Sequence, residues 1–282
     1  MGAGFGLIYG VTGRFHFAFA STFLAAPLGA VLLNEAGVPL VPAIVVGVAI
    51  GMLLGVLIEI VVYRPVAERS RDYGLLAIFV SSLGVTVVVE NVVRLIWGSN
   101  YRNLPTGFGV SPIKLGSGVT ASNLQVVGVV VAVVLVGGLW AYLRWSRRGV
   151  AIRAVSSNPD LAESVGVSTR VMFALVFAIG SLLCGAGAIV FAMEKAVIPD
   201  MGTSPTFFAF VVAFVAGTKS GPLRFGLTGL AIGVLQSVIL IWVSEVWQEV
   251  VVFGILFFFV ALRPVFEGGS LPWLRPGRRA PA

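Results

Sequence analysis

The sequence contains few charged residues. Only 11% of its 282 residues are charged, whereas soluble domains carry roughly 25%. Hydrophobic residues make up 58% of the chain, and its mean hydropathy is +1.02. This composition excludes a soluble globular domain and predicts an integral membrane protein. The 35 glycines are typical of helices that pack closely in lipid, so we expect one transmembrane domain over residues 1–282.

Cysteine and histidine are nearly absent. Cys184 is the one cysteine and lies in an apolar run, which rules out an intramolecular disulfide and a metal cluster built from cysteines. We interpret it as a small buried residue. His16 is the one histidine, which rules out a histidine-based metal site. We therefore expect no metal and no cofactor.

Motifs of common enzymes are missing as well. The sequence has no GxSxG, HExxH, CxxC or Walker A motif, and the fragment GTKSG at 217–221 lacks the upstream glycine and the strand of a phosphate-binding loop. We therefore expect no enzymatic activity. The N-terminus also lacks a basic secretory leader, and Gly6 occupies the position where a myristoylation signal has Ser or Thr. Membrane insertion would depend on the spans themselves.

Long apolar runs are abundant, and a membrane-spanning helix needs about 20 residues. The pattern predicts an all-α bundle of about eight transmembrane helices. The sixth and eighth runs are short, so either could be re-entrant. The first 13 residues would span only about 20 Å as a helix, so they are expected to be the end of a longer span. The predicted spans are 15–33, 38–62, 74–97, 123–144, 171–193, 206–217, 225–243 and 248–262.

The net charge of +7 is explained by topology. Basic residues sit at the ends of apolar runs and form no stripe interleaved with aromatic residues, so we expect no nucleic-acid partner. Most of them lie in alternate loops, and basic loops face the cytoplasm. This predicts a multi-pass protein of the inner or plasma membrane. Its expected polar segments are a cytoplasmic loop at 146–170, an extracytoplasmic loop at 98–122 and a basic cytoplasmic tail at 263–282.

Small residues recur at helical spacing in two spans. Gly47, Gly51 and Gly55 follow one another at i, i+4 and i+8, and Gly229 and Gly233 repeat the spacing. Such faces let helices approach closely. We interpret them as packing positions, with dimerisation between subunits as the alternative.

Polar residues inside the third predicted span are candidates for a translocation pathway. Glu90 and Asn91 lie in the run GVTVVVENVVRLIWG, with Arg94 at i+4 from Glu90 and Thr86 one turn earlier. Intramembrane charges are costly unless they face the interior or one another. Glu90 and Arg94 therefore form either a polar point on a substrate path or an internal ion pair that fixes packing. Asn91 is the stronger pathway candidate because it is not engaged in that pair.

Two further polar residues lie at predicted membrane edges. We interpret His16 as an interfacial residue, with a place on the pathway as the alternative. Glu59 is interpreted as an anchor at headgroup level beside Tyr63 and Arg64. Arg64 would anchor the end of this span, and Pro65 would stop the helix.

A polar segment, RAVSSNPDLAESVGVSTR at 153–170, contains the signals of a short helix at about 159–165. A helix of barely two turns is not stable alone, and Leu161 and Val165 would form one apolar face at i, i+4. This face must lie on another surface, either the lipid headgroups or a cytoplasmic partner. The N-cap, the first-position proline, the acidic first turn and the C′ glycine are Asn158, Pro159, Asp160 and Gly166.

The sequence resembles the permease subunits of the branched-chain amino acid type of ABC importer. The resemblance covers nearly the whole chain and is densest in three stretches. The family pattern R-A-x-x-x-N-x-x-x-A-x-x-x-G-[IV] falls on Arg153, Ala154, Asn158, Ala162, Gly166 and Val167. The second stretch, at 63–99, matches at Arg64, Pro65, Gly84 and Asn91, and the third, LIYGVTGRFHFAFA, at Gly10 and His16.

This resemblance implies a permease that imports branched-chain or other amino acids, or a related small polar solute, by alternating access. Its partners would be a second, similar permease subunit, two cytoplasmic ATPase subunits and an extracytoplasmic solute-binding protein, which would land in part on the loop at 98–122. The alternative is a secondary transporter or channel without ATPases, which predicts more intramembrane charges and discontinuous helices in matched halves. Coupling to the ATPases would fall on Asn158, Pro159, Asp160, Leu161, Ala162, Val165 and Gly166.

The sequence departs from the family at two places. Where the family reads N-F-A-H-G-E, this chain has GRFHFA at 13–18 and retains only the histidine. The family's glycine-rich G-G-x-G-S-x-x-G-A is GTKSGPLRF here, with Thr218, Ser220 and Arg224 in place of glycines. If either segment lines the substrate path, this permease handles its solute differently from relatives that carry aliphatic amino acids.

Overall fold

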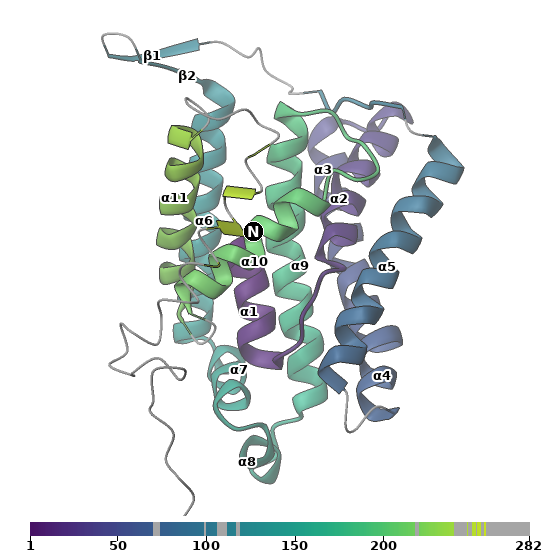
Figure 1. Ribbon diagram of the computed structural model, residues 1–282, viewed down its shortest axis with the longest axis vertical. Helices are drawn as coiled ribbons and strands as arrows, with labels where there is room; N and C mark the ends of the chain where they lie inside the picture. Colours follow the sequence, from purple (N-terminus) through teal and green to yellow (C-terminus); the bar gives the residue numbers. More distant parts are fainter. Residues whose placement is uncertain are drawn as a thin grey trace, which may run out of the picture.

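The computed structural model describes residues 1–69, 74–98, 100–105, 112–116, 119–217, 220–239 and the single positions 247, 250, 251, 253, 254 and 257. Most of the predicted eighth span, the end of the seventh, the tail at 263–282, and Thr218 lie outside these residues. The described part is a bundle of helices with a small antiparallel hairpin at one end (Figure 1).

The helices and strands follow the predicted spans closely, with additions between them. In chain order they are α1 (Gly2–Thr12), α2 (Phe19–Glu35), α3 (Leu40–Leu57), the π-helix η1 (Ile58–Tyr63), α4 (Arg64–Arg69), α5 (Gly74–Trp97), β1 (Pro112–Gly116), β2 (Val119–Ser122), α6 (Asn123–Trp145), α7 (Arg147–Ser157), α8 (Pro159–Ser164), α9 (Thr169–Glu194), α10 (Thr203–Ala216) and α11 (Pro222–Ile239).

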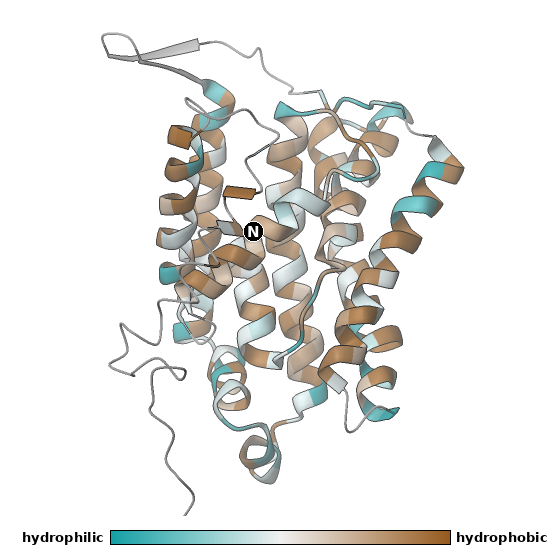
Figure 2. Cartoon of the chain, viewed as in Figure 1, coloured by the Kyte–Doolittle hydropathy of each residue, from teal (hydrophilic) through white to brown (hydrophobic). Residues whose placement is uncertain are grey.

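Five helical stretches of the described chain are long and apolar enough to cross a membrane: Leu40–Arg69, α5, α6, α9 and α11. Shorter apolar helices are α1, α2 and α10. Hydrophilic residues gather toward the two ends of the bundle, while apolar residues cover the helices between them (Figure 2). The prediction of a polytopic helical membrane protein is confirmed.

The connecting segments fall at opposite ends of the bundle. Helices α4, α7 and α8 lie at one end, and the β1–β2 hairpin lies at the other (Figure 1). The basic loops predicted to be cytoplasmic therefore share one end, which we call the inner end. The end with the hairpin is called the outer end.

Close contact between α3 and its neighbours depends on glycine. Gly47, Gly51 and Gly55 are buried on α3, and a Cβ atom at Gly51 would stand 3.0 Å from the carbonyl oxygen of Thr22 on α2. At Gly55 it would collide with Oγ of Ser181 on α9. These glycines face helices of the same chain.

The glycines of α11 are less tightly packed. A Cβ at Gly229 would make an ordinary contact of 3.7 Å with Val212, and a Cβ at Gly233 would meet no atom of the described residues within 4 Å. The close-packing face expected at Gly233 is therefore not found in this part of the chain, where the adjacent Ile232 is the residue of α11 that packs against Val211 and Val212 of α10.

The predicted span at 15–33 begins as a helix only at Phe19. Gly13 ends α1 in the left-handed conformation, with φ of 67°, and its N–H donates to the carbonyl of Tyr9 at 2.8 Å. Residues 13–18 are not helical and run between α1 and α2 through the middle of the bundle (Figure 1). We call residues 13–18 the broken segment.

The helix that starts at Leu40 does not stop at Pro65, contrary to the prediction. It continues as α3, η1 and α4 to Arg69. The N–H of Arg64 donates to the carbonyl of Glu59, five residues back. Because this π-helical turn already interrupts the regular i→i−4 ladder, a proline without an N–H is accommodated directly after it.

Helix α7 was not predicted. Its N-cap is Ser146, whose Oγ accepts the N–H of Gly149 at 2.8 Å, and it buries Ile152 and Val155. Its sequence RRGVAIRAVSS contains a glycine and two valines, which are weak helix formers. Tertiary packing therefore decides its conformation.

Candidate functional site

The broken segment exposes its two sides to different environments. Arg14, His16 and Ala18 are buried, whereas Phe15 and Phe17 are half-buried. Residues 13–16 are irregular and residues 17 and 18 form a turn, and this path brings Phe15 and Phe17 to the same side, where both contact Phe79 and Phe210. One side faces η1 and α9, and the other faces α5 and α10.

A buried ion pair joins the broken segment to η1. Nη1 of Arg14 bonds to both carboxylate oxygens of Glu59, and the Glu59 side chain is 1% exposed. The Arg14 guanidinium also stacks over the ring of Phe173, 5.0 Å from its centroid. The prediction that Glu59 is a headgroup anchor is wrong, because its side chain points into the bundle and is neutralised there by Arg14.

His16 bonds to η1 as well. Its Nδ1 lies 2.8 Å from Oη of Tyr63, and both side chains are fully buried. The imidazole packs against the ring of Phe177 at a centroid distance of 4.9 Å, and its Nε2 has no partner among the described residues. The interpretation of His16 as an interfacial residue is wrong.

Helix α5 satisfies the backbone of the broken segment. The N–H of Phe17 donates to Oγ of Ser82 at 3.3 Å, and the hydroxyl of Thr86 donates to the carbonyl of Phe17 at 3.2 Å. Non-helical backbone at membrane depth is stable only where protein or water satisfies its polar groups. Thr86, a predicted pathway residue, therefore lies at the site and holds its backbone.

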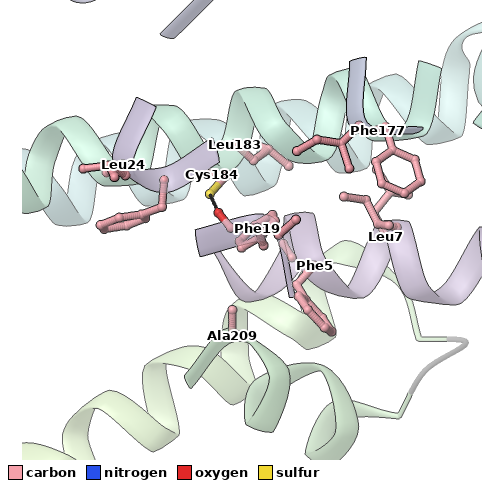
Figure 3. Close-up of a cluster of buried hydrophobic side chains, with 14 of the residues drawn as sticks. Phe5, Leu7, Phe19, Leu24, Phe177, Leu183, Cys184 and Ala209 are labelled. Atoms are coloured by element: carbon pink, nitrogen blue, oxygen red, sulfur yellow. Dashed lines mark hydrogen bonds between the residues drawn. The ribbon is translucent and has the colours of Figure 1, made fainter. Parts of the chain in front are cut away.

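Helix α2 starts from a firmly packed position. Phe19 is fully buried among side chains of α1, α9 and α10, including Phe5 and Cys184 (Figure 3). The thiol of Cys184 donates to the carbonyl of Phe19 at 3.6 Å. The first residue of α2, where the broken segment ends, is thus held in place by contacts with α9.

The opposite side of the broken segment is aromatic. The ring of Phe15 stacks on that of Phe214 with centroids 6.0 Å apart, and the ring of Phe17 meets those of Phe79 and Phe207 at 5.3 and 5.6 Å. Phe15 and Phe17 thereby connect α5 with α10. A solute in contact with this side would meet phenyl rings, with polar atoms from the backbone.

The remaining pathway candidates lie toward the outer end. Oε1 of Glu90 accepts a hydrogen bond from Thr203 at 2.9 Å, while Arg94 lies 4.0 Å from Asp200. The Glu90–Arg94 pair considered from the sequence is absent among the described residues, because Thr203 at the start of α10 bonds to Glu90 and Asp200, just before that helix, lies near Arg94. Asn91 is exposed and donates to the carbonyl of Val87 on its own helix at 2.7 Å.

Helix α8 has the predicted caps. Oδ1 of Asn158 accepts the N–H of Leu161 at 3.0 Å. At the other end Gly166 has φ of 87°, its N–H donates to Glu163 at 2.9 Å, and the N–H of Val167 donates to Ala162 at 3.0 Å. These two bonds form a Schellman motif. The short helix is therefore defined at both ends by local sequence.

The apolar face of α8 is open in this chain. Ala162 is 3% exposed and fixes the helix to the bundle, whereas Leu161 is 64% and Val165 72% exposed. Figure 1 shows α8 protruding from the inner end. The surface that would cover Leu161 and Val165 is not part of the described chain.

Two connections lead from α8 to the broken segment. Oγ of Ser156 on α7 donates to the carbonyl of Gly10 in the last turn of α1 at 2.9 Å, three residues before Gly13. On the other side Glu163 bonds to Thr169 at the start of α9. The next residue, Arg170, bonds to Glu68 of α4 at 3.2 Å. These contacts join the α7–α8 region to α1 on one side of the site and to α9 and α4 on the other.

Sequence reasoning missed Arg14, Glu59 and Tyr63 as members of one site. The available signal was an arginine and a glutamate inside apolar runs, each needing a partner. Their separation of 45 residues gave no local pattern to match.

A helical chain that crosses the membrane repeatedly, with a polar break inside the bundle and a capped helix at its inner end, has the features of a membrane permease. The comparisons agree. The chain belongs to the family described as the permease component of branched-chain amino acid transport systems, whose model matches residues 1–261. It is a multi-pass protein of the cell membrane.

Individual relatives are more distant. The chain is similar to the high-affinity branched-chain amino acid transport system permease protein BraD of Pseudomonas aeruginosa, at 28% identity over 93% of this chain and 88% of BraD. It is also similar to the permease protein LivH of the same kind of system from Escherichia coli, at 27% identity over 93% of this chain and 87% of LivH. No solved structure shows significant similarity to the chain.

Proposed function

We propose that this protein is the transmembrane permease subunit of an ATP-driven ABC importer for branched-chain or other amino acids, or a related small polar solute. It would work with a second permease subunit, two cytoplasmic ATPase subunits and an extracytoplasmic solute-binding protein. The observation that carries the proposal is the exposed apolar face of α8, at Leu161 and Val165, on a rigidly capped helix at the end where basic loops gather.

The proposed coupling runs from α8 to the broken segment. Closure of the ATPases would move α8, and α7 would transmit the movement to α1 through Ser156 and Gly10. Because α1 ends at Gly13, the movement would reach residues 13–18 directly. The ion pair of Arg14 with Glu59 and the bond of His16 with Tyr63 would hold this segment in the arrangement seen in the structure until α1 moves.

The proposed pathway passes the aromatic side of the broken segment. Phe15, Phe17 and Thr86 would line its middle, and Glu90 would lie nearer the outer end. Asn91 is exposed on α5, so it would reach the pathway only if this face of α5 meets the second permease subunit.

The outer end is proposed to receive the solute-binding protein. Arg102 pairs with Glu35 and forms a backbone bridge with Val197, which ties the start of the 98–122 loop to the last residue of α2 and to the segment after α9. A protein that lands on this loop would therefore contact a surface connected to three spans.

The coupling proposal is tested by Leu161→Asp with Val165→Asp. The double variant should still insert in the membrane but should lose co-purification of the ATPase subunits. Val150→Asp is the matched control, because Val150 is 53% exposed on the neighbouring α7. Unchanged co-purification of the double variant would exclude α8 as the contact.

The alternative, a transporter without ATPases, has some structural support. The Arg14–Glu59 pair adds intramembrane charges, and the broken segment is a discontinuity of the kind such transporters use. The family match favours the ATP-driven importer. Solute uptake into liposomes that contain this permease without ATPase subunits would establish the alternative, whereas uptake that requires ATPases and ATP would eliminate it.

A further inference from the structure

A cavity at the inner end borders the contact between Ser156 and Gly10, and the coupling described above does not require that anything occupy it. It has a volume of about 980 Å³ and lies between α1, the last turns of α6, α7 and the start of α11. It is separate from the aromatic side of the broken segment, because neither Phe15 nor Phe17 is among its lining residues.

The lining of this cavity has two chemical parts. Its walls include apolar side chains such as Leu139, Leu143 and Phe225, and two arginines, Arg144 and Arg153, also line it. None of the described residues that line it is acidic, and neither arginine forms an ion pair with the described residues. Within the described part of the chain, the cavity therefore offers two positive charges without an acidic partner, beside an apolar surface.

The position of the cavity matches the level of lipid headgroups. Arg144 lies in the last turn of α6, and its guanidinium stacks over Trp140, 5.6 Å from the ring centroid. Trp140 and Trp145 both line the cavity, and tryptophan is enriched where a membrane meets water. Basic pockets between transmembrane helices on the cytoplasmic side bind anionic headgroups.

We propose that this cavity binds one anionic phospholipid, with the phosphate between Arg144 and Arg153 and an acyl chain along Leu139 and Phe225. A soluble phosphate would leave the apolar wall uncovered. The chain's own tail at 263–282 is a poorer occupant, because it carries four arginines and one glutamate and would bring positive charge to a positive site. A lipid here would bind α6 and α7 together and brace α1 against them.

The test measures lipid binding to the purified full-length chain by native mass spectrometry. Dioleoyl phosphatidylglycerol should bind at one site more tightly than dioleoyl phosphatidylcholine. Arg144→Gln with Arg153→Gln should weaken phosphatidylglycerol binding roughly 30-fold, from the typical contribution of a basic residue near an anionic membrane surface. Arg144→Lys with Arg153→Lys should retain most of the binding, which shows that loss in the Gln variant is not a folding defect.

Arg147→Gln with Arg148→Gln is the matched control. These arginines are neighbours in the sequence and exposed, but they do not line the cavity, so binding at the single site should persist. Equal loss in both double Gln variants would overturn the proposal in favour of diffuse attraction. Equal binding of the two lipids would overturn it as well. Glycerol 1-phosphate that displaces phosphatidylglycerol at similar concentration would show a soluble phosphate site instead.

Discussion

The Arg14–Glu59 pair provides the sharpest test of the described site. Arg14 is 9% and Glu59 1% exposed, so removal of one partner leaves an uncompensated charge inside the bundle. Breaking a buried ion pair costs about 3–5 kcal/mol. At about 2–4 °C per kcal/mol for a chain of this general size, Glu59→Leu or Arg14→Met should lower the apparent unfolding temperature by roughly 6–20 °C.

Replacing both residues of the pair should not lower the unfolding temperature as the single variants do. Replacing both partners removes both charges, and apolar replacement of a buried pair is often neutral or stabilising. Arg14→Met combined with Glu59→Leu should therefore regain most of the lost unfolding temperature. The double-mutant cycle isolates the coupling between the two side chains.

The assay is the fraction of purified protein that remains monodisperse in size-exclusion chromatography after heating. Arg94→Met is the matched control, because Arg94 and Asp200 have side chains 42% and 57% exposed at 4.0 Å, and such surface pairs contribute about 0–1 kcal/mol. Single variants that unfold at the wild-type temperature, or a double variant as unstable as the sum of its singles, would refute the buried pair.

Three further predictions follow from individual contacts. Tyr63→Phe removes the hydrogen-bond partner of His16 Nδ1 and should lower the free energy of unfolding by about 1–3 kcal/mol, measured by chemical denaturation in detergent. An unchanged free energy of unfolding would contradict the 2.8 Å bond between Nδ1 and the Tyr63 hydroxyl. Gly51→Val should destabilise the fold by at least about 1–3 kcal/mol through overpacking against α2, whereas Gly84→Val should not, since no described atom lies within 4 Å of a Cβ there. Gly166→Ala places a side chain at φ of 87° and should lower the free energy of local unfolding of α8 by about 1–2 kcal/mol. Hydrogen exchange should become faster at the α8 amides alone, and unchanged exchange would count against the Schellman cap.

Local signals were sufficient for part of the architecture. The spans follow from apolar runs, and α8 follows from Asn158, Pro159 and Gly166, because caps act on the residues next to them. Helix α7 escaped prediction since its helicity depends on burying Ile152 and Val155.

The candidate site depended on contacts that are remote in sequence. The run at 15–33 is mostly apolar, so its composition does not show that the helix begins only at Phe19. It also does not show that Ser82 and Thr86, 65 and 69 residues away from Phe17, bond to the backbone of the broken segment. A π-helical turn has no distinct composition, so the orientation of Glu59 could not be predicted either.

The π-helical turn also determines how one stripe of the long helix is used. Gly51, Gly55, Glu59 and Tyr63 follow at steps of four residues, which drift around a regular α-helix of 3.6 residues per turn. The wider π-helical turn offsets this drift, so all four residues stay on one face of the helix. On this face the two glycines allow close helix packing, and one and two turns further toward the inner end Glu59 and Tyr63 bond to the broken segment. If residues 58–63 formed regular α-helix instead, the drift would remain and Tyr63 would turn away from His16, although Phe15, Phe17 and Thr86 of the proposed pathway would be unchanged.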